Sequence, residues 1–137
     1  MRLTSFTDYG LRVLMRMAGE LERPFTTAEL ADEFRVSRNH LAKVTSALAG
    51  VGYLETRRGA GGGAMLAQPA SDIWLGDVVA RLEGDQALVE CFAARRNACT
   101  LTPRCRLMAR PAHAEAAFID DLNRGTLADC VYIPAEA

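Results

Sequence analysis

Three of the four cysteines lie close together, at Cys91, Cys99 and Cys105. The residues between them include Asn97 and Pro103, which disfavour a continuous helix or strand. A segment without regular structure can fold inward, so that its thiols reach one centre. Thiolates are ligands of tetrahedral zinc and of cubane iron–sulfur clusters, and both centres need four ligands. The segment therefore predicts a metal or cluster site with three thiolates and one further ligand.

The residues alone leave the fourth ligand open. Cys130 follows Cys105 by 25 positions and His113 follows it by eight, and His113 is equally explained as a surface imidazole. The segment has no C-x-x-C pair, which argues against a structural zinc knuckle. An exposed centre with one ligand that is not a thiolate suits a sensor, because the iron with the odd ligand is the labile one.

Length and composition indicate one soluble domain, or a small domain with an appendage. The chain has 137 residues, 50% of them hydrophobic, and no apolar run approaches the roughly 20 residues that cross a bilayer. Asp8 stands where a signal peptide needs its apolar region, so we expect a cytoplasmic protein without membrane association. In that reducing compartment, clustered cysteines are expected to be metal ligands or redox sensors rather than disulfides.

The charged residues are unevenly distributed, although the net charge is only -1. Residues 35–58 hold five basic residues against one acidic residue, whereas residues 69–137 hold seven arginines against ten acidic residues. A basic region in a mildly acidic chain predicts a DNA-binding part joined to a different module. Solvated helix faces explain the charges alone equally well.

Residues 4–20 are expected to form the first helix, with Thr4 or Ser5 at its N-cap. Asp8 and Arg12 lie four residues apart, and spacing alone indicates a surface ion pair. The predicted apolar face of this helix consists of Tyr9, Val13, Leu14, Met17 and Leu21.

Two short helices are expected next. A capping box at residues 26–29 starts the first, and Ser37 caps the second, which runs to Ala49. Two helices joined by a three-residue turn form a helix-turn-helix, whose second helix presents its first turn to base edges. Asn can pair with adenine and Arg with guanine, whereas Lys more often contacts phosphate. The side chains expected to face outward and contact DNA are Ser37, Arg38, Asn39, His40 and Lys43.

Residues 53–67 predict a strand, a glycine-rich tip and a second strand, which is the wing of a winged helix. Arg57 and Arg58 precede the tip and are expected to contact the phosphate backbone or the minor groove. A nucleotide-binding P-loop fits less well, because it needs Gly-Lys-Ser/Thr leading into a helix. The tip glycines expected at the DNA are Gly59, Gly61 and Gly62.

Two further helices are predicted. Residues 69–72 are expected to cap a helix over residues 73–83, with Trp74 in the core, and Gly84 and Asp85 close it. After Cys105 a second helix is expected to start near Arg110, because proline is not tolerated in mid-helix. Its near-heptad stripe predicts either a dimerisation helix or packing against the chain's own domain. The members of the stripe are Leu107, Pro111, Ala114, Phe118 and Leu122.

Four motifs together resemble a known family. They are residues 3–12, the helix opening Ser37–Leu41, the wing residues 58–63, and three cysteines after the helical segment Leu75–Val79. In this combination the chain resembles the NsrR-type regulators, the nitric-oxide-sensing branch of the winged-helix iron–sulfur regulators. That superfamily also includes the IscR-type and RirA-type repressors. The resemblance covers nearly the whole chain.

The resemblance implies a homodimer with one [4Fe–4S] cluster per subunit, or alternatively a [2Fe–2S] cluster. Its ligands would be the three cysteines and a carboxylate from the first helix of the partner subunit, which falls on Asp8, with Arg12 beside it. This implication replaces the surface-pair interpretation of Asp8. Met108 stands where the IscR-type pattern has a histidine. The spacing from Cys91 to Cys99 also occurs in RirA-type proteins, so the Asp8 helix is what favours nitric oxide sensing.

The predicted architecture is mainly α. It comprises a winged helix-turn-helix DNA-binding domain over residues 1–84, a cluster-binding loop over 85–106, and a dimerisation helix with a tail over 107–137. The predicted function is a repressor that binds a double-stranded DNA operator, releases it on nitrosylation of the cluster and so controls nitric oxide detoxification genes. A regulator that responds to iron or cluster status is the alternative, and a small iron–sulfur redox protein is a second one. The sequence has no dinucleotide fingerprint or nucleophile–base signature, so we expect no enzyme.

Overall fold

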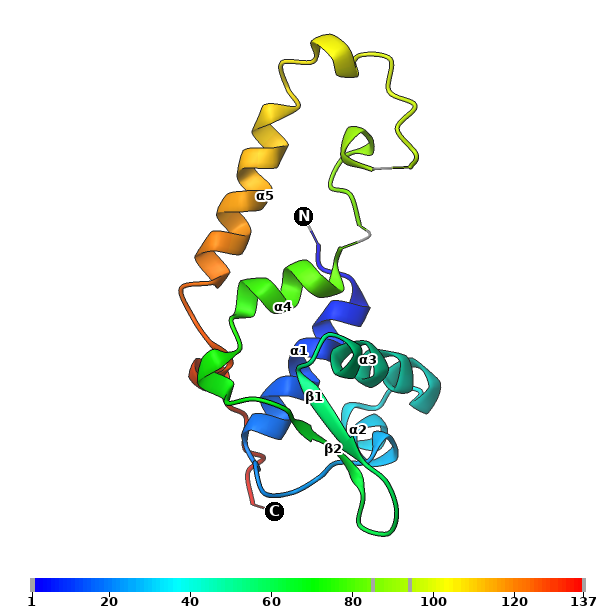
Figure 1. Cartoon of the computed structure of the whole chain (residues 1–137), viewed down its shortest axis with the longest axis vertical. Helices are drawn as coiled ribbons and strands as arrows, with labels where there is room; N and C mark the ends of the chain where they lie inside the picture. Colours follow the sequence, from blue (N-terminus) through cyan, green and yellow to red (C-terminus); the bar gives the residue numbers. More distant parts are fainter. Residues whose placement is uncertain (1, 85, 94, 137) are drawn as a thin grey trace.

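A helical domain with one two-stranded sheet bears an arm that is formed by the last long helix (Figure 1). The structure is a computed structural model and describes residues 2–84, 86–93 and 95–136. This architecture confirms the predicted class, a mainly α winged helix-turn-helix. Its helices are α1 Ser5–Ala18, α2 Thr27–Phe34, α3 Arg38–Gly50, α4 Leu75–Leu82 and α5 Ala109–Leu122, and its strands are β1 Leu54–Arg57 and β2 Gly63–Leu66. Short 3-10 turns lie at Ala70–Asp72, Glu90–Phe92, Thr102–Arg104 and Leu127–Cys130.

Helix α1 begins where the sequence predicts and ends earlier. Thr4 is its N-cap and accepts a hydrogen bond from the N–H of Thr7. The helix ends at Ala18, and a side chain at Gly19 would collide with the backbone carbonyl of Tyr132. Leu21, predicted on the apolar face of the helix, therefore lies beyond its end and is 56% exposed. That part of the prediction is wrong.

The two helices of the helix-turn-helix form for the predicted reasons. Thr26 and Glu29 make the reciprocal hydrogen bonds of a capping box at the start of α2. Arg35 then adopts the left-handed conformation, with φ of 56°, which ends α2. Ser37 caps α3 by accepting a hydrogen bond from the N–H of His40 at 3.1 Å. The predicted turn over residues 35–37 is confirmed.

The wing is an antiparallel hairpin that is tied to the start of α2. Leu54 pairs with Leu66 and Arg57 pairs with Gly63. On the other side of β2, Ala64 exchanges two backbone hydrogen bonds with Phe25, at 2.8 and 2.7 Å. The strand thus fixes the hairpin to the segment that precedes α2.

One hydrophobic core lies among α1, α2, α3, the wing and α4. Helix α1 runs through its middle and packs against α3, α4 and β2. Burial of these apolar side chains supplies most of the driving force for folding. The largest fully buried hydrophobic side chains are Phe25, Leu14, Met17, Leu30, Leu41, Leu48, Ile73 and Leu127.

Helix α4 starts later than predicted. The sequence predicts a helix from Ile73 capped by residues 69–72, but those residues form a 3-10 turn and Ile73 is extended. The reason is pairing with the C-terminal segment, because Leu127 donates its N–H to the Ile73 carbonyl at 2.8 Å. Trp74 lies in this paired segment and is 44% exposed, so its predicted core position is wrong. Asp85, expected to close the helix, lies outside the described residues.

Helix α5 forms most of the arm. It starts at Ala109, so Pro111 lies in the first turn, where proline is tolerated. Its C-terminal end packs on α4, where Asn123 accepts from the N–H of Asp77 at 3.0 Å and donates to its carboxylate at 2.9 Å. None of its residues is fully buried in the single chain. Across the described residues, no helix has the length and apolar character needed to span a membrane.

Candidate nucleic-acid interface and cysteine segment

The first two turns of α3 present three side chains to solvent. Arg38, Asn39 and Lys43 are all exposed, as expected for side chains that contact DNA. Arg38 lies 3.6 Å from the carboxylate of Asp32, a loose pair that leaves 69% of the arginine side chain exposed. Ser37 is also exposed, but its hydroxyl oxygen is engaged as the cap of α3. These positions agree with the predicted outward face.

His40 does not face outward, and this prediction is wrong. Its ring packs edge-on against Phe6 and Tyr9 of α1, with ring centroids 6.3 and 5.4 Å apart. Its Nε2 atom is buried and has no hydrogen-bond partner in the described chain. The sequence held a signal for this position, because His40 precedes the buried Val44 by one helical turn and so lies at the edge of the inner face.

The wing places further basic groups near α3. Arg57 and Arg58 are exposed, and Arg57 pairs only loosely with Glu55, at 3.7 Å. A hollow of about 400 Å³ lies between α3 and β1, with Ser46 and Thr56 among its lining residues. Helix α3 and the wing therefore border one surface, which carries positive charge and has a hollow between the two elements. Such a surface can receive the phosphate backbone of DNA.

The tip of the wing depends on its glycines. Gly59 and Gly61 have φ of 95° and 74°, a region that other residues rarely adopt. A side chain at Gly62 would collide with the backbone carbonyl of Arg57. The three glycines that the sequence assigns to DNA contact thus have a structural role in the tight turn.

Asp8 and Arg12 form an ion pair on an exposed part of α1. Arg12 Nη2 lies 2.7 Å from Asp8 Oδ2, and the two side chains are about half exposed. The guanidinium also lies 5.2 Å from the centre of the Tyr9 ring. The carboxylate is accessible to a group from outside the subunit.

The cysteine segment is a loop at the far end of the arm from the wing (Figure 1). Cys91, Cys99 and Cys105 are half-buried and free of disulfides. Asn97 organises the loop by accepting from the N–H of Cys99 at 3.0 Å, and Thr102 donates to the Cys99 carbonyl at 3.0 Å. Ala94, in the middle of this stretch, lies outside the described residues.

The donor types in the chain fit an iron–sulfur centre. Three free thiols and an accessible carboxylate are a suitable donor set. Within residues 2–84, 86–93 and 95–136, no three Cys, His, Asp or Glu side chains come together as a metal-binding group. Cys130 lies in the 3-10 turn Leu127–Cys130, which packs on α1, and His113 is exposed on α5.

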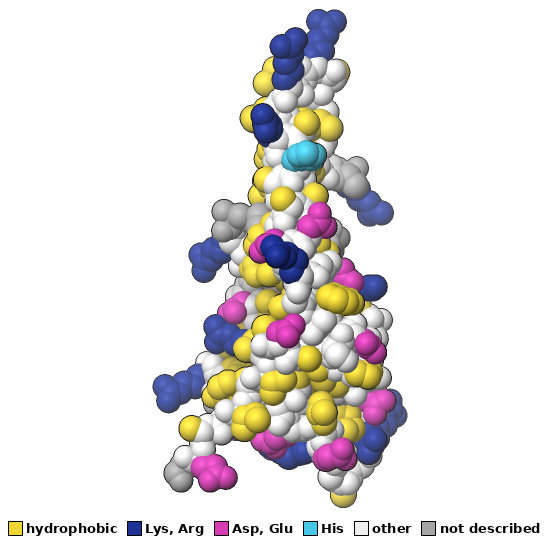
Figure 2. All heavy atoms as spheres, turned by 90° about the vertical axis from the view of Figure 1, so that its left-hand side faces the viewer, with side chains coloured by type: hydrophobic (Ala, Val, Ile, Leu, Met, Phe, Trp, Pro, Cys, Tyr) yellow, Lys and Arg dark blue, Asp and Glu magenta, His cyan; other side chains and the backbone are white. Residues whose placement is uncertain are grey.

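The cysteine segment and the start of α5 are strongly basic, although residues 69–137 as a whole have a negative net charge. Residues 91–114 contain five arginines and no acidic residue. Figure 2 shows Lys and Arg side chains at the end of the arm. The arginines, all exposed, are Arg95, Arg96, Arg104, Arg106 and Arg110.

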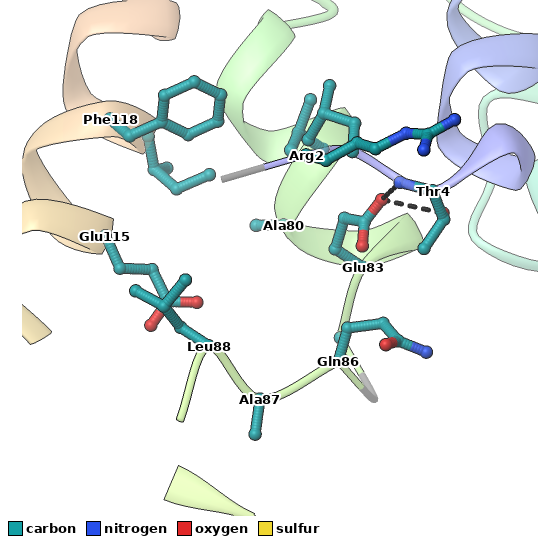
Figure 3. A pocket seen from close by; sticks show the side chains of 13 residues that line it. Arg2, Thr4, Ala80, Glu83, Gln86, Ala87, Leu88, Glu115 and Phe118 are labelled. Atoms are coloured by element: carbon teal, nitrogen blue, oxygen red, sulfur yellow. Dashed lines mark hydrogen bonds between the residues drawn. The ribbon is translucent and has the colours of Figure 1, made fainter. Parts of the chain in front are cut away.

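A hydrogen-bonded junction joins the start of α1 to the end of α4 (Figure 3). Glu83 Oε1 accepts from the N–H and the hydroxyl of Thr4, both at 2.7 Å. Burial raises the pKa of Glu83, but hydrogen bonds from Thr7 and Thr4 outweigh it, so the pKa lies below its ordinary value. Beside the junction lies a cavity of about 400 Å³, lined by Leu88 and by Phe118 of α5 among others.

Comparison with known proteins places the chain among transcriptional regulators. The HTH-type transcriptional regulator NsrR of Bacillus subtilis (strain 168) is 41% identical over 132 residues, which cover 96% of this chain and 90% of that protein. The HTH-type transcriptional regulator NsrR of Shouchella clausii (strain KSM-K16) is also 41% identical over 132 residues, covering 96% and 89%. These relatives are regulators and not enzymes, as expected from the sequence.

Solved structures share the fold. The global cysteine regulator CymR (YrzC) of B. subtilis superposes with a TM-score of 0.70 at 25% identity, covering 94% of this chain and 95% of that one. IscR of T. potens gives a TM-score of 0.71 at 23% identity, covering 94% and 85%. Residues 3–132 match the Rrf2 family, described as "Iron-dependent Transcriptional regulator". The chain therefore belongs to the Rrf2 family of transcriptional regulators.

Proposed function

We propose that the protein is a homodimeric repressor that senses nitric oxide through an iron–sulfur cluster and releases its operator in response. The observation that carries this proposal is the 41% identity to two regulators named NsrR, which extends over 132 residues and includes both the Asp8 helix and the cysteine segment. The proposed regulated genes are those for nitric oxide detoxification, and the proposed location is the cytoplasm.

The surface bordered by α3 and the wing supports operator binding. Asn39 and Arg38 are exposed in the first turn of α3, which enters the major groove in helix-turn-helix proteins. Lys43 and Arg57 are exposed on the same helix and on the neighbouring wing, where they would reach phosphates. We assign base contacts to the first pair and backbone contacts to the second.

The donor set supports a cluster shared between two subunits. Cys91, Cys99 and Cys105 of one chain and Asp8 of the partner subunit would hold a [4Fe–4S] cluster, with [2Fe–2S] as the alternative. The half-exposed Asp8 carboxylate is accessible to a second chain. Cys130, by contrast, lies in the 3-10 turn Leu127–Cys130, which packs on α1 of its own chain. Bound there, the cluster would supply iron that reacts with nitric oxide.

Helix α5 is the proposed dimerisation element. Leu107, the first member of the predicted stripe, lies before α5 and is 68% exposed. Within α5, Ala114 is exposed and the other members of the stripe, Pro111, Phe118 and Leu122, are only half-buried in the single chain. A partly exposed stripe at near-heptad spacing is typical of a helix that packs on a symmetry-related copy. Two subunits would then bind two half-sites of an inverted repeat.

In the proposed switch, the protein binds the operator while the Asp8 carboxylate is a ligand of the partner subunit's cluster. It releases the operator when nitric oxide displaces this carboxylate from the cluster. Moving the bound population from 99:1 to 1:99 needs about 5.5 kcal/mol of differential binding. In a symmetric dimer each subunit contributes one such ligand, so the change occurs at both DNA-binding domains.

One anaerobic titration tests the proposal. Purified protein is titrated with nitric oxide while visible absorbance and operator binding are followed together. We expect a cluster absorption that is lost on titration, with operator release in parallel. Protein that lacks the absorption, or that binds operator equally before and after nitric oxide, contradicts the proposal.

Regulation by iron is the second candidate function. The family description, "Iron-dependent Transcriptional regulator", favours it. The same protein would then release its operator when iron is withdrawn and would respond weakly to nitric oxide. Repeating the measurement with an iron chelator in place of nitric oxide separates the two signals.

A further inference from the structure

The contacts between α1 and the first turn of α3 point to a coupling device that lies between the proposed cluster ligand and the DNA-facing residues. We propose that Tyr9 and His40 transmit the state of Asp8 to α3, and that both are positioning residues for operator binding. The inference rests on the proposed function, in which Asp8 is a ligand of the partner subunit's cluster.

A continuous series of side-chain contacts leads from Asp8 to α3. Arg12 donates through Nε to Asp8 Oδ1 at 3.3 Å and through Nη2 to Oδ2 at 2.7 Å. The same guanidinium lies over the Tyr9 ring, 5.2 Å from its centre. The Tyr9 ring packs edge-on against the His40 ring, with 5.4 Å between the ring centroids and an angle of 79° between the ring planes. Arg12, Tyr9 and His40 thus link the carboxylate to the recognition helix.

The Asp8 end of the series responds to ligation. Both carboxylate oxygens accept hydrogen bonds from Arg12, so a carboxylate that binds iron gives up part of this pairing. The guanidinium must then find a new position, and its cation–π contact with Tyr9 changes with it. The side chains of Asp8 and Arg12 are 49% and 50% exposed, so both can move without opening the core.

The His40 end of the series is fixed by packing. The Phe6 ring also packs edge-on against the His40 ring, with 6.3 Å between the ring centroids. The buried Nε2 atom of His40 has no hydrogen-bond partner in the described chain. The N–H of His40 is bound to Ser37 Oγ, which caps α3. A displacement of the ring therefore acts on the first turn of α3, where Arg38 and Asn39 lie between the cap and His40.

The face of α1 next to Tyr9 is closely packed, which limits how far the helix can move. A side chain at Gly10 would lie 2.5 Å from Leu82 Cδ1 of α4 and 3.9 Å from Val44 Cγ1 of α3. Helix α1 is thus closely packed against α4 and α3 at the residue next to Tyr9. It has little room to absorb a change at Tyr9 by moving as a whole.

The test is the ratio of operator affinities between cluster-loaded and cluster-free protein. In the wild type we expect loaded protein to bind at least about fivefold more tightly, the low end of ordinary coupling between sites. His40→Ala and Tyr9→Leu should bring this ratio close to one, while visible absorbance still shows a full cluster. His40→Phe keeps an aromatic ring and should retain the wild-type ratio.

Glu20→Gln is the matched control, because it removes a side-chain contact to the other end of α1, the ion pair of Glu20 Oε1 with Arg16 Nη2 at 2.9 Å, outside the proposed series. It should leave the ratio unchanged. An equal weakening of operator binding in the loaded and cluster-free forms of His40→Ala would mean that His40 contacts DNA directly, and would overturn the proposal. A wild-type ratio of operator affinities in both His40→Ala and Tyr9→Leu would also overturn the proposal. A wild-type ratio of one would instead contradict the proposed function itself.

Discussion

Thr4 donates both its backbone N–H and its hydroxyl to one carboxylate oxygen of Glu83, at 2.7 Å each. Thr4 caps the helix that holds Asp8, and Glu83 follows α4 directly, eight positions before Cys91. The two parts of the proposed intersubunit site therefore begin at one junction within each chain.

Glu83→Gln should destabilise the protein in a pH-dependent manner. Because the pKa of Glu83 is lowered in the folded state, its contribution is fully present above the ordinary value of 4.5 and is lost as pH falls through the lower folded value. We expect a difference of about 1 kcal/mol at neutral pH, a modest value because the group is largely solvated. Urea unfolding of both proteins between about pH 7 and pH 3 measures it.

The matched control for this change is Glu22→Gln, since Glu22 is exposed in the turn after α1. Its unfolding free energy at neutral pH should lie within about 0.5 kcal/mol of the wild type, as for most exposed substitutions. A gap between Glu83→Gln and the wild type that widens on acidification would have the wrong sign for a lowered pKa.

Gly76→Ala should weaken the contact between α4 and α5. A side chain there would collide with the backbone carbonyl of Ile119 and lie 2.6 Å from Asn123 Oδ1, and the backbone cannot yield without moving α5. We expect a loss of about 1–3 kcal/mol from overpacking, which exceeds the helix-propensity gain of about 1 kcal/mol. Gly50→Ala, in a helix end with no atom within 4 Å of the new side chain, should be neutral or stabilising. Chemical denaturation compares the two.

The elements that depend on local signals could be predicted from the sequence. The capping box at Thr26 and the cap at Ser37 mark the starts of α2 and α3, and both are confirmed. The start of α4 could not be predicted, because Ile73 is held extended by a hydrogen bond from Leu127, more than fifty residues later. A sequence pattern contains no information on such a pairing partner.

The positions of the site residues also depend partly on local sequence and partly on residues far away in the chain. The exposure of Asn39 and Lys43 follows from helical spacing, whereas the inward position of His40 depends on Phe6 and Tyr9 of another helix. The cysteines are recognisable by type and spacing, but within the residues that the structure describes no three Cys, His, Asp or Glu side chains form a metal-binding group, so the proposed fourth ligand could not be predicted from one chain.

Lys43→Ala should weaken operator binding by a similar factor for all sequences. The side chain is exposed on the α3 surface and is assigned to a phosphate, so the substitution removes one counterion-releasing interaction per subunit. The slope of log affinity against log salt should become shallower by about 0.9 for each phosphate that is no longer neutralised. Fluorescence anisotropy over a salt series measures the slope, and an unchanged slope would argue against a phosphate contact.

Asn39→Ala should instead relax the base preference at one position of each half-site. Removing a bidentate interaction with adenine costs about 1–3 kcal/mol of discrimination, and the salt slope should stay as in the wild type. Binding to operators substituted at single positions locates the effect. A uniform weakening over all operators would mean that Asn39 and Lys43 have exchanged roles.

Asp8→Ala should leave a cluster that assembles but is more labile, because three thiolates remain while the carboxylate is absent. We expect its visible absorbance to decay at least about tenfold faster under air, together with weaker retention of the operator. Cys99→Ser should prevent stable assembly, whereas Cys130→Ser should behave as the wild type, since Cys130 lies in the 3-10 turn that packs on α1. Decay in Asp8→Ala at the wild-type rate, with normal operator release, would remove Asp8 from the ligand set and leave the fourth position to another group.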